Sequence, residues 1–363
     1  MKVAVYTITK NEEQFIKRWA ESANEADYLL IVDTGSTDST VELADHYADD
    51  VYSITVSPWR FDDARNAALS LIPSDIDMCI SLDADEVLVP GWRQELEKLP
   101  PHVTRPAYKY TWSWNVYGAP DLQYTGDKIH SRHGYRWRHP VHEVLTPTGI
   151  VEVREWCGLE IHHYPDATKS RSSYLPLLEL AVQEDPTDDR NSHYLAREYY
   201  YRGEYEKAAE EFKRHLSLPK AQWPAERAKS MRLLAQCDPD SQEYWLLESA
   251  RTDPSSRESW VALAQYYHDH QEWEKCLSAA ETAMSIQERG LTYITESWAW
   301  GPIAYDLGAV AAYHLGEWVK AYNWGVSAYM HSPDDTRLST NVREFYLPAM
   351  SMVESSTWPP VTT

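Results

Sequence analysis

The chain of 363 residues lacks the features of membrane, secreted and metal-finger proteins. It has no apolar run approaching the ~18 residues that cross a bilayer, and it opens on an apolar segment without a signal-peptide pattern. Its four cysteines are far apart and form no C-x-x-C pair, so they favour reduced thiols in a core. These absences predict a cytoplasmic protein without a membrane span. The four cysteines are Cys79, Cys157, Cys237 and Cys276.

Positive charge and phenylalanine are also scarce. The net charge of -22 argues against a general polyanion binder, because affinity for a phosphate backbone comes from lysine and arginine. One local basic stretch, residues 128–142, keeps an anionic lipid or nucleic-acid acceptor open as a lower-ranked alternative. Only 4 Phe stand against 16 Trp and 25 Tyr, residues that stack on sugars and bases but also fill helical-repeat cores.

Residues 1 to about 100 alternate between strand and helix patterns. This alternation predicts an α/β domain with a mostly parallel sheet covered on both faces. Ligands bind such sheets at the carboxyl ends of the strands. Polar clusters at 9–12, 33–38 and 83–86 follow three expected strands, so they should converge. The expected strands are 3–8, 28–32, 49–56 and 78–82, and the expected helices are 12–23, 39–47 and 62–71.

The rest of the chain changes character twice. Short aromatic strands are expected over 105–165, and a wholly helical pattern begins near residue 188. Within it, three positions recur 68 residues later, twice the period of about 34 that marks tetratricopeptide repeats. We therefore expect an α/β domain over 1–168, an all-α tetratricopeptide-like domain over 169–353, and a disordered tail over 354–363. The recurring positions are Ala196, Gly203 and Ala208, matched by Ala264, Gln271 and Cys276.

An acidic run ends the last strand of the α/β pattern. Asp83, Asp85 and Glu86 lie within four residues, and carboxylates this close repel each other unless a cation lies between them. Oxygen ligands suit Mg²⁺ or Mn²⁺, and a metal held by one or two carboxylates usually has a diphosphate as its other partner. A solvated acidic turn is the alternative that this run alone leaves open.

Four motifs carry a resemblance to a known family. Residues 9–13, 32–40, 61–66 and 82–86 occur in the order and spacing of family 2 glycosyltransferases of the GT-A fold, which they resemble over about residues 1–165. The resemblance implies a Rossmann-like catalytic domain that moves a sugar from a nucleotide sugar, a UDP-sugar first, with inversion and with Mn²⁺ or Mg²⁺. Some relatives append tetratricopeptide repeats and glycosylate peptides. This layout favours a peptide or protein acceptor over a glycan, a lipid or a modified DNA base, and repeats that recruit the acceptor or form a homodimer.

The donor side can be assigned from the motifs. Asp33 ends a strand and is placed to accept from a base or ribose, although capping its own turn is the alternative. Arg65 lies among alanines, so its guanidinium needs an anionic partner, either a diphosphate or the 83–86 cluster. The residues expected to bind the nucleotide sugar are Thr7, Thr9, Glu12, Asp33, Arg65, Asp83 and Ala84.

The resemblance also implies metal, base and acceptor residues. Asp85 would ligate the metal, with Asp83 near the ribose or a metal-bound water, and His163 is favoured over His162 as a further ligand. Glu143 is the expected base with His142 assisting, and Glu86 is the alternative. An ion pair of Glu143 with Arg136 or Arg138 is the structural alternative. The acceptor surface is expected to include Trp112, Trp114, Arg136 and Trp137.

Two other classes compete with a glycosyltransferase. A nucleotidyltransferase would show a glycine-rich, arginine-containing loop after the first strand, and residues 7–11 contain neither. A non-catalytic repeat scaffold with a decayed enzyme domain is the second. The intact Asp33, Arg65, Asp83 and Asp85 argue against such decay.

Overall fold

The computed structural model describes residues 1–166 and 174–351, which form two compact units. The N-terminal unit is Met1–Pro186 with Leu291–Tyr293, and the helical unit is Thr187–Gly290 with the residues from Ile294 onward. The boundary expected at 168–169 and the tail expected at 354–363 lie outside the described residues. In the described ranges no helix is both long and apolar enough to cross a membrane.

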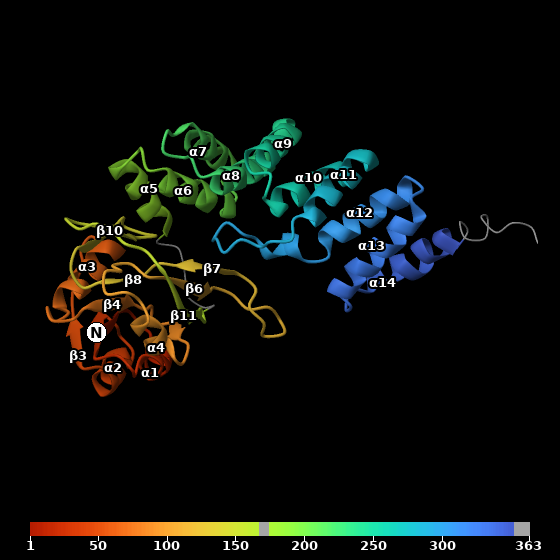
Figure 1. Ribbon diagram of the computed structural model, residues 1–363. Helices are drawn as coiled ribbons and strands as arrows, with labels where there is room; N and C mark the ends of the chain where they lie inside the picture. The colour runs from red at the N-terminus through yellow and green to blue at the C-terminus, as the bar shows by residue number, and fades with distance from the viewer. Residues whose placement is uncertain (167–173, 352–363) are drawn as a thin grey trace, which may run out of the picture. The chain divides into compact units, whose positions relative to one another are not determined.

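A five-stranded sheet in the order β3-β2-β1-β4-β8 forms the centre of the N-terminal unit. Its first four strands run parallel and β8 is antiparallel to β4, as the strand–helix alternation predicts for the parallel part (Figure 1). The strands are β1 (Val3–Thr9), β2 (Tyr28–Asp33), β3 (Asp50–Ser53), β4 (Met78–Ser81) and β8 (Ile129–Ser131). The third strand, β3, is shorter than the expected 49–56.

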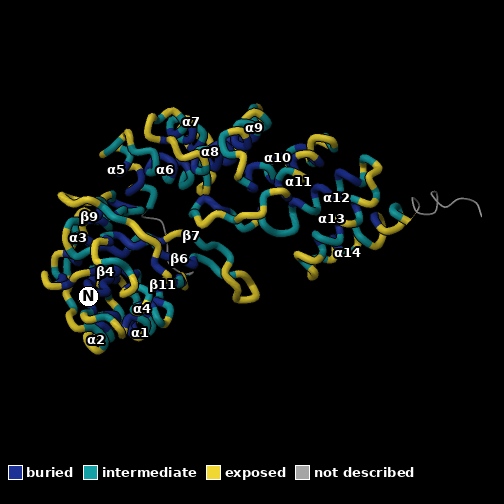
Figure 2. Tube along the Cα trace, in the orientation of Figure 1, coloured by how far each residue is buried: buried dark blue, intermediate teal, exposed yellow. Residues whose placement is uncertain are grey.

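Both faces of this sheet are covered, because its strands carry apolar side chains on both sides. One face packs against α1 (Glu13–Ser22) and α2 (Thr40–Tyr47). The other packs against α3 (Phe61–Leu71) and the hairpin of β9 (Tyr135–Arg138) and β10 (Val144–Pro147). The inner strands β1, β2 and β4 are accordingly almost wholly buried, whereas the edge strand β3 is mostly exposed (Figure 2).

A second, four-stranded sheet in the order β5-β11-β6-β7 contains the aromatic strands. Its middle strand, β11, runs antiparallel to β5 and parallel to β6, so it brings residues near position 163 beside residue 86. The register pairs His163 with Glu86. Its elements, with the two neighbouring helices, are β5 (Glu86–Leu88), α4 (Trp92–Glu97), β6 (Ala107–Thr111), β7 (Gln123–Gly126), β11 (Trp156–His163) and α5 (Tyr174–Glu184).

The helical unit consists mainly of four helix pairs, as the repeat predicts. Their first helices are α6 (Asp189–Tyr201), α8 (Pro224–Cys237), α10 (Arg257–Asp269) and α12 (Ile303–His314). Their second helices are α7 (Tyr205–Ser217), α9 (Gln242–Thr252), α11 (Trp273–Ser285) and α13 (Trp318–His331). The remaining elements are η1 (Pro239–Ser241), η2 (Ser297–Trp300), α14 (Thr336–Thr340) and the π-helix η3 (Asn341–Tyr346).

Equivalent turn residues confirm the repeat. Gly203 and Gly316 end their first helices with left-handed φ angles of 76° and 80°, and Gln271 adopts φ 58° at the matching place. The four matched small residues of the repeat are all buried, because each lies where two helices approach closely. They are Ala196, Ala208, Ala264 and Cys276. All four cysteines of the chain are free thiols; three are buried and Cys237 is half-buried.

Candidate functional site

The first two polar clusters converge at the carboxyl ends of β1 and β2, as expected from the parallel sheet. The register pairs Thr9 with Asp33. Beyond it, the Asn11 backbone N–H donates to Ser36 Oγ at 2.8 Å, and the Thr37 N–H donates to Asn11 Oδ1 at 2.8 Å. Asn11 has a left-handed φ of 57°, which asparagine tolerates better than most residues. The two loops therefore form one cross-braced wall.

Asp33 stabilises that wall from within. Its carboxylate accepts from the backbone N–H groups of Gly35 at 2.9 Å and Ser36 at 3.0 Å, and Thr9 Oγ1 donates to it at 3.4 Å. This is the turn-capping arrangement that the sequence left as the alternative role. The side chain is buried, so a ligand that used this carboxylate would have to compete with the turn. A donor-binding role for Asp33 stays a prediction.

The other expected donor residues lie around this edge. Thr7 is fully buried and its hydroxyl donates to the Ile8 carbonyl at 3.3 Å, while Ala84 is also buried. The Glu12 backbone N–H donates to Thr40 Oγ1 at 2.7 Å, which joins the end of β1 to the start of α2. Their contacts with a nucleotide sugar stay predictions.

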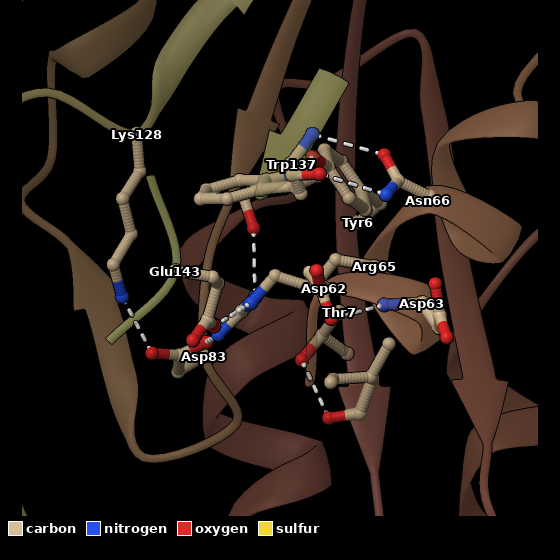
Figure 3. A network of polar contacts seen from close by, with 12 residues as sticks. Tyr6, Thr7, Asp62, Asp63, Arg65, Asn66, Asp83, Lys128, Trp137 and Glu143 are labelled. Carbon is tan, nitrogen blue, oxygen red and sulfur yellow. Dashed lines mark hydrogen bonds and ion pairs between the residues drawn. The ribbon is translucent and has the colours of Figure 1, made fainter. Parts of the chain in front are cut away.

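Arg65 is the centre of a buried ionic network at the end of β4. Its Nη2 donates to Asp83 Oδ1 at 2.6 Å, its Nη1 donates to Ser81 Oγ at 2.9 Å, and its Nε donates to Glu143 (Figure 3). Its guanidinium also lies 5.2 Å from the ring centre of Trp137. The anionic partner that the sequence required for Arg65 is therefore Asp83 of the acidic run, together with Glu143.

Asn66, the residue after Arg65, attaches helix α3 to strand β9. The amide of Asn66 brackets the backbone of Trp137: Nδ2 donates to the Trp137 carbonyl, and Oδ1 accepts from the Trp137 N–H, both at 2.9 Å (Figure 3). Ala64 is fully buried and allows α3 to approach the sheet. The Ala-Arg-Asn motif thus supplies close packing, charge and a strand anchor in consecutive residues.

Lys128 is a second internal cation at the same strand end. Its Nζ lies 2.5 Å from Asp83 Oδ2 and 3.1 Å from Glu86 Oε1. Burial opposes ionisation of Asp83, but Arg65 and Lys128 together hold its pKa well below the usual range. The sequence alone predicted no contact between Lys128 and the acidic run. The available signal was that a buried acidic run needs a cation, and Lys128 heads the basic stretch.

Glu86 is oriented inward. It is 1% exposed, and its carboxylate accepts from the Tyr110 hydroxyl at 2.6 Å and from the Asp83 backbone N–H at 2.8 Å. Burial raises the pKa of Glu86, Lys128 opposes this rise, and the charge of Asp83 adds to it. The arrangement braces the loop that carries Asp83 and Asp85. A base role for Glu86 stays a prediction without support from these contacts.

Asp85 and His163 form a pair that could hold a metal. His163 Nε2 lies 3.3 Å from Asp85 Oδ2, while its Nδ1 donates to the Trp112 carbonyl at 3.0 Å. Because a carbonyl can only accept, Nδ1 carries the proton and Nε2 faces the carboxylate, an orientation typical of a ligating histidine. His162 instead contacts Glu160 at 2.9 Å. The preference for His163 over His162 thus has geometric support.

The expected three-residue metal set is not assembled. Both oxygens of Asp83 are bonded to cations, one to Arg65 and one to Lys128, so a metal bound by Asp83 would lie close to these two positive charges. Within residues 1–166 and 174–351, no group of three or more His, Cys, Asp or Glu side chains is placed to hold a metal ion. The residues that fit a metal are the pair Asp85 and His163, with further ligands left to a substrate.

The predicted base, Glu143, also contacts Arg65. Glu143 pairs with Arg65 rather than with Arg136 or Arg138, which point outward from β9. His142 and His139 adopt left-handed φ angles of 49° and 80°. Such strained backbone persists only where the surroundings enforce it, and it concentrates at functional sites. The strain is a reason to keep this loop in the site.

The basic stretch is not one surface. Lys128 is turned toward Asp83, His130 is fully buried, and Arg132 donates to the carbonyls of Ile72 and Pro73. His133, Arg136 and Arg138 are the exposed basic residues of the stretch, and Arg136 and Arg138 are separated by a buried residue because β9 alternates buried and exposed positions. A continuous anion-gripping strip, left open by the sequence, is therefore absent from the described part of this stretch.

Some of the expected acceptor residues are buried and others lie beside the candidate metal pair. Trp137 is a buried residue, 3% exposed, whose indole N–H donates to the Tyr6 hydroxyl at 2.8 Å. It supports Arg65 rather than facing an acceptor, which corrects the expectation. Trp112 stacks on His163 with ring centres 4.2 Å apart, and Trp114 stacks on Tyr164 at 5.6 Å. These two tryptophans keep their place beside the candidate metal pair.

Comparison with known families agrees with the motifs. Residues 4–134 match the model of glycosyl transferase family 2. Over 166 residues the chain is 28% identical to a lipopolysaccharide core biosynthesis glycosyltransferase, LpsC, of Rhizobium meliloti (strain 1021), covering 42% of this chain and 59% of the relative. Over 97 residues it is 34% identical to an uncharacterized glycosyltransferase of Rickettsia bellii (strain RML369-C), covering 26% and 32%. The chain thus spans less than two thirds of these curated relatives.

Two solved structures that resemble the chain each cover about half of it. YrrB, described as a TPR protein with an unusual peptide-binding site, matches with 13% identity and a TM-score of 0.36, covering 47% of this chain and 81% of that one. PilF of Pseudomonas aeruginosa matches with 13% identity and a TM-score of 0.38, covering 48% and 72%. Scores this low carry no inference beyond the helix pairs already described.

Proposed function

The N-terminal unit contains a glycosyl transferase family 2 domain, and from it we propose that this protein is an inverting glycosyltransferase that moves a sugar from a UDP-sugar to a peptide or protein. The observation that carries the proposal is the strand-end network of Arg65, Asp83 and Glu143 beside the pair of Asp85 and His163. It gathers an arginine, a potential base and a metal-binding pair at the edge where parallel sheets bind ligands.

On the donor side, the end of β1 and β2 would hold the nucleotide, and Asp85 with His163 would hold Mn²⁺ or Mg²⁺. The bound metal supplies positive charge to neutralise the leaving diphosphate. Two protein ligands suit this task, because Mg²⁺-type sites usually leave several positions to water and substrate phosphates. Asp83 would act by holding Arg65 and Lys128 in place rather than as a ligand.

On the acceptor side, Glu143 would take the proton of the attacking group. The ion pair with Arg65 orients this carboxylate at the strand-end site.

The first test is donor binding with and without metal. Thermal-shift measurements with UDP-, GDP- and CMP-sugars, each with Mn²⁺ or EDTA, should show stabilisation by a UDP-sugar that requires Mn²⁺. Asp85→Asn should abolish the Mn²⁺-dependent part and leave the melting temperature of the unliganded protein nearly unchanged. Full UDP-sugar turnover in EDTA, or in Asp85→Asn, would refute the metal role.

A second test separates base from donor binding. Glu143→Gln should reduce transfer by about 10²–10⁴-fold, the usual contribution of a general base, while retaining UDP-sugar binding. If Glu143→Gln left the rate of transfer unchanged, another residue would have to be the base.

A glycan acceptor is the second candidate. The relative in Rhizobium meliloti is named for lipopolysaccharide core biosynthesis, and it is 28% identical to this chain over 166 residues. Assays should therefore offer core oligosaccharide beside peptide acceptors, and transfer to the oligosaccharide alone would replace the peptide proposal.

A further inference from the structure

A cluster of stacked side chains adjoins the candidate metal pair. The rings of Trp114 and Tyr164 are parallel within 4°, with centres 5.6 Å apart. The guanidinium of Arg18 lies 4.8 Å from the ring centre of Tyr164 and 5.1 Å from that of Phe15. These four residues, the Arg18 cluster, come from α1, from the position after β11 and from the segment between β6 and β7. The cluster therefore joins three separate parts of the N-terminal unit.

Arg18 is held in this cluster by aromatic rings. It is half-buried, and its Nε and Nη2 atoms are buried without a hydrogen-bond partner. Within residues 1–166 and 174–351 it forms no ion pair, unlike Arg65. A guanidinium is weakly hydrated and stacks on aromatic faces, so the rings of Phe15 and Tyr164 replace the usual anionic partner. Arg18 thus acts on its surroundings mainly through the position of the Tyr164 ring.

The cluster also holds the backbone of the metal pair. The Tyr164 N–H donates to the Asp85 carbonyl at 2.9 Å, and the indole N–H of Trp114 donates to the His163 carbonyl at 3.1 Å. Asp85 is therefore bonded to the residue that follows His163. A shift of Tyr164 would move the main chain of both candidate ligands.

The imidazole of His163 has a separate support. Its Nδ1 donates to the Trp112 carbonyl at 3.0 Å, and its ring stacks on Trp112 with centres 4.2 Å apart. Trp112 thus sets the orientation of the imidazole, whereas the Arg18 cluster sets the backbone that carries it. Loss of Arg18 should accordingly change the separation of the two ligands more than the tautomer of His163.

We propose that Arg18 is a positioning residue for the metal pair, which it fixes through Tyr164 at the separation that one Mn²⁺ or Mg²⁺ ion requires. The inference rests on the proposed function, in which Asp85 and His163 hold the metal. It assigns Arg18 no contact with the metal or the substrate. Small divalent ions demand near-ideal ligand geometry, so a pair fixed in advance binds them more tightly than one that must rearrange.

The test is a Mn²⁺ titration of the full chain without nucleotide sugar, with free Mn²⁺ measured by electron paramagnetic resonance. Arg18→Met should weaken Mn²⁺ binding about tenfold, the usual effect of losing a residue that orients a metal ligand. Arg18→Lys should restore most of the affinity, because an ammonium also stacks on an aromatic ring. The matched control is Lys17→Met, which removes the same charge from the adjacent, exposed position of α1 and should leave the affinity unchanged.

Two variants of Tyr164 test the same path without changing charge. Tyr164→Phe keeps the ring and should bind Mn²⁺ as the wild-type chain does, whereas Tyr164→Leu should lose as much affinity as Arg18→Met. Combining Tyr164→Leu with Arg18→Met should add no further loss, because both act through one ring. If Arg18→Met does not fold, the comparison of Tyr164→Phe with Tyr164→Leu decides the proposal.

Turnover provides a readout that general destabilisation would not give. In Arg18→Met the Mn²⁺ concentration for half-maximal transfer should rise about tenfold, while the rate at saturating Mn²⁺ stays near that of the wild-type chain. A lower rate at every Mn²⁺ concentration, together with a lower melting temperature of the metal-free protein, would instead show a purely structural role.

The binding data also separate this proposal from the proposed function. Mn²⁺ binding that is lost in Asp85→Asn but unchanged in Arg18→Met would overturn the role of Arg18 and leave the metal pair standing. Equal weakening in Arg18→Met and Lys17→Met would reduce the effect to net charge. A wild-type chain that bound no Mn²⁺ would overturn the metal pair and the role of Arg18 together.

Discussion

Removing Arg65 should destabilise the N-terminal unit far more than removing any surface charge. Its side chain is 6% exposed and bonds to two carboxylates, one of which, Glu143, is itself 11% exposed. Breaking a buried ion pair by deleting one partner typically costs about 3–5 kcal/mol, because an uncompensated charge remains. We expect Arg65→Met to fall in this range, with Asp83 still compensated by Lys128.

Two further variants, Glu143→Gln and the double variant, measure the coupling energy between Arg65 and Glu143. Glu143→Gln should cost about 1–3 kcal/mol, the price of disturbing a buried charged hydrogen bond. In the double variant, Arg65→Met with Glu143→Gln, the two losses should not add. Directly bonded residues usually couple by about 0.5–3 kcal/mol, and the burial of this pair favours the upper half of that range.

The assay must report on one unit of a two-unit chain. Unfolding of the whole protein need not be two-state, so a single denaturation midpoint would mix the units. Hydrogen exchange followed by mass spectrometry resolves peptides from α3 and β4 and gives their opening free energy separately. Lys98→Met is the control, because the Lys98–Glu95 pair is exposed and should contribute at most about 1 kcal/mol.

Two results would refute the reasoning. Additive losses in the double variant, within about 0.5 kcal/mol, would mean that Arg65 and Glu143 do not interact in solution. A cost of Arg65→Met equal to that of Lys98→Met would mean that the guanidinium is hydrated rather than buried.

Three further predictions concern other parts of the chain. Gln271→Gly should stabilise the helical unit by up to about 1 kcal/mol and Gly203→Ala should destabilise it by about 1–2 kcal/mol, because both residues adopt left-handed φ. Hydrogen exchange in peptides from α6 and α10 checks both variants, and a change of the same sign in both would contradict the shared turn. Tyr110→Phe should lower the stability of the N-terminal unit by about 1.5–3 kcal/mol, because it removes the hydrogen bond to Glu86. Hydrogen exchange in peptides from β6 measures this loss, and an unchanged stability would mean that another donor replaces the hydroxyl. Burial lowers the pKa of His130 to about 4. The unfolded chain then binds a proton first, so stability should fall by up to about 3 kcal/mol as pH drops from ~6.5 to 4, and His130→Gln should flatten this slope.

The positions of the polar clusters could be predicted because they follow from topology. Alternating strands and helices force a parallel sheet, and a parallel sheet collects its strand ends at one edge. The contacts of Asn11 with Ser36 and Thr37 confirm that consequence. The helix pairs could also be predicted from the sequence, because the spacing of small residues such as Ala196 and Ala264 is a local pattern.

The partners of each charge could not be predicted, because they come from distant parts of the chain. Asp83 and Asp85 are two residues apart, yet the first meets Lys128 from the segment before β8 and the second meets His163 from the end of β11. These contacts depend on the order of the strands within each of the two sheets. No spacing within the acidic run encodes that order, so the run could equally have been one shared metal site.

The separation of these two aspartates has a consequence for charge balance. Around Arg65 and Lys128 lie three carboxylates, Asp83, Glu86 and Glu143, and burial raises the pKa of Glu86. The network is therefore close to neutral and has little positive charge to offer a diphosphate. A nucleotide sugar bound at this edge needs an additional cation, and Asp85 with His163 is the pair placed to hold one. The charge balance of the network thus favours the metal dependence that Asp85→Asn tests.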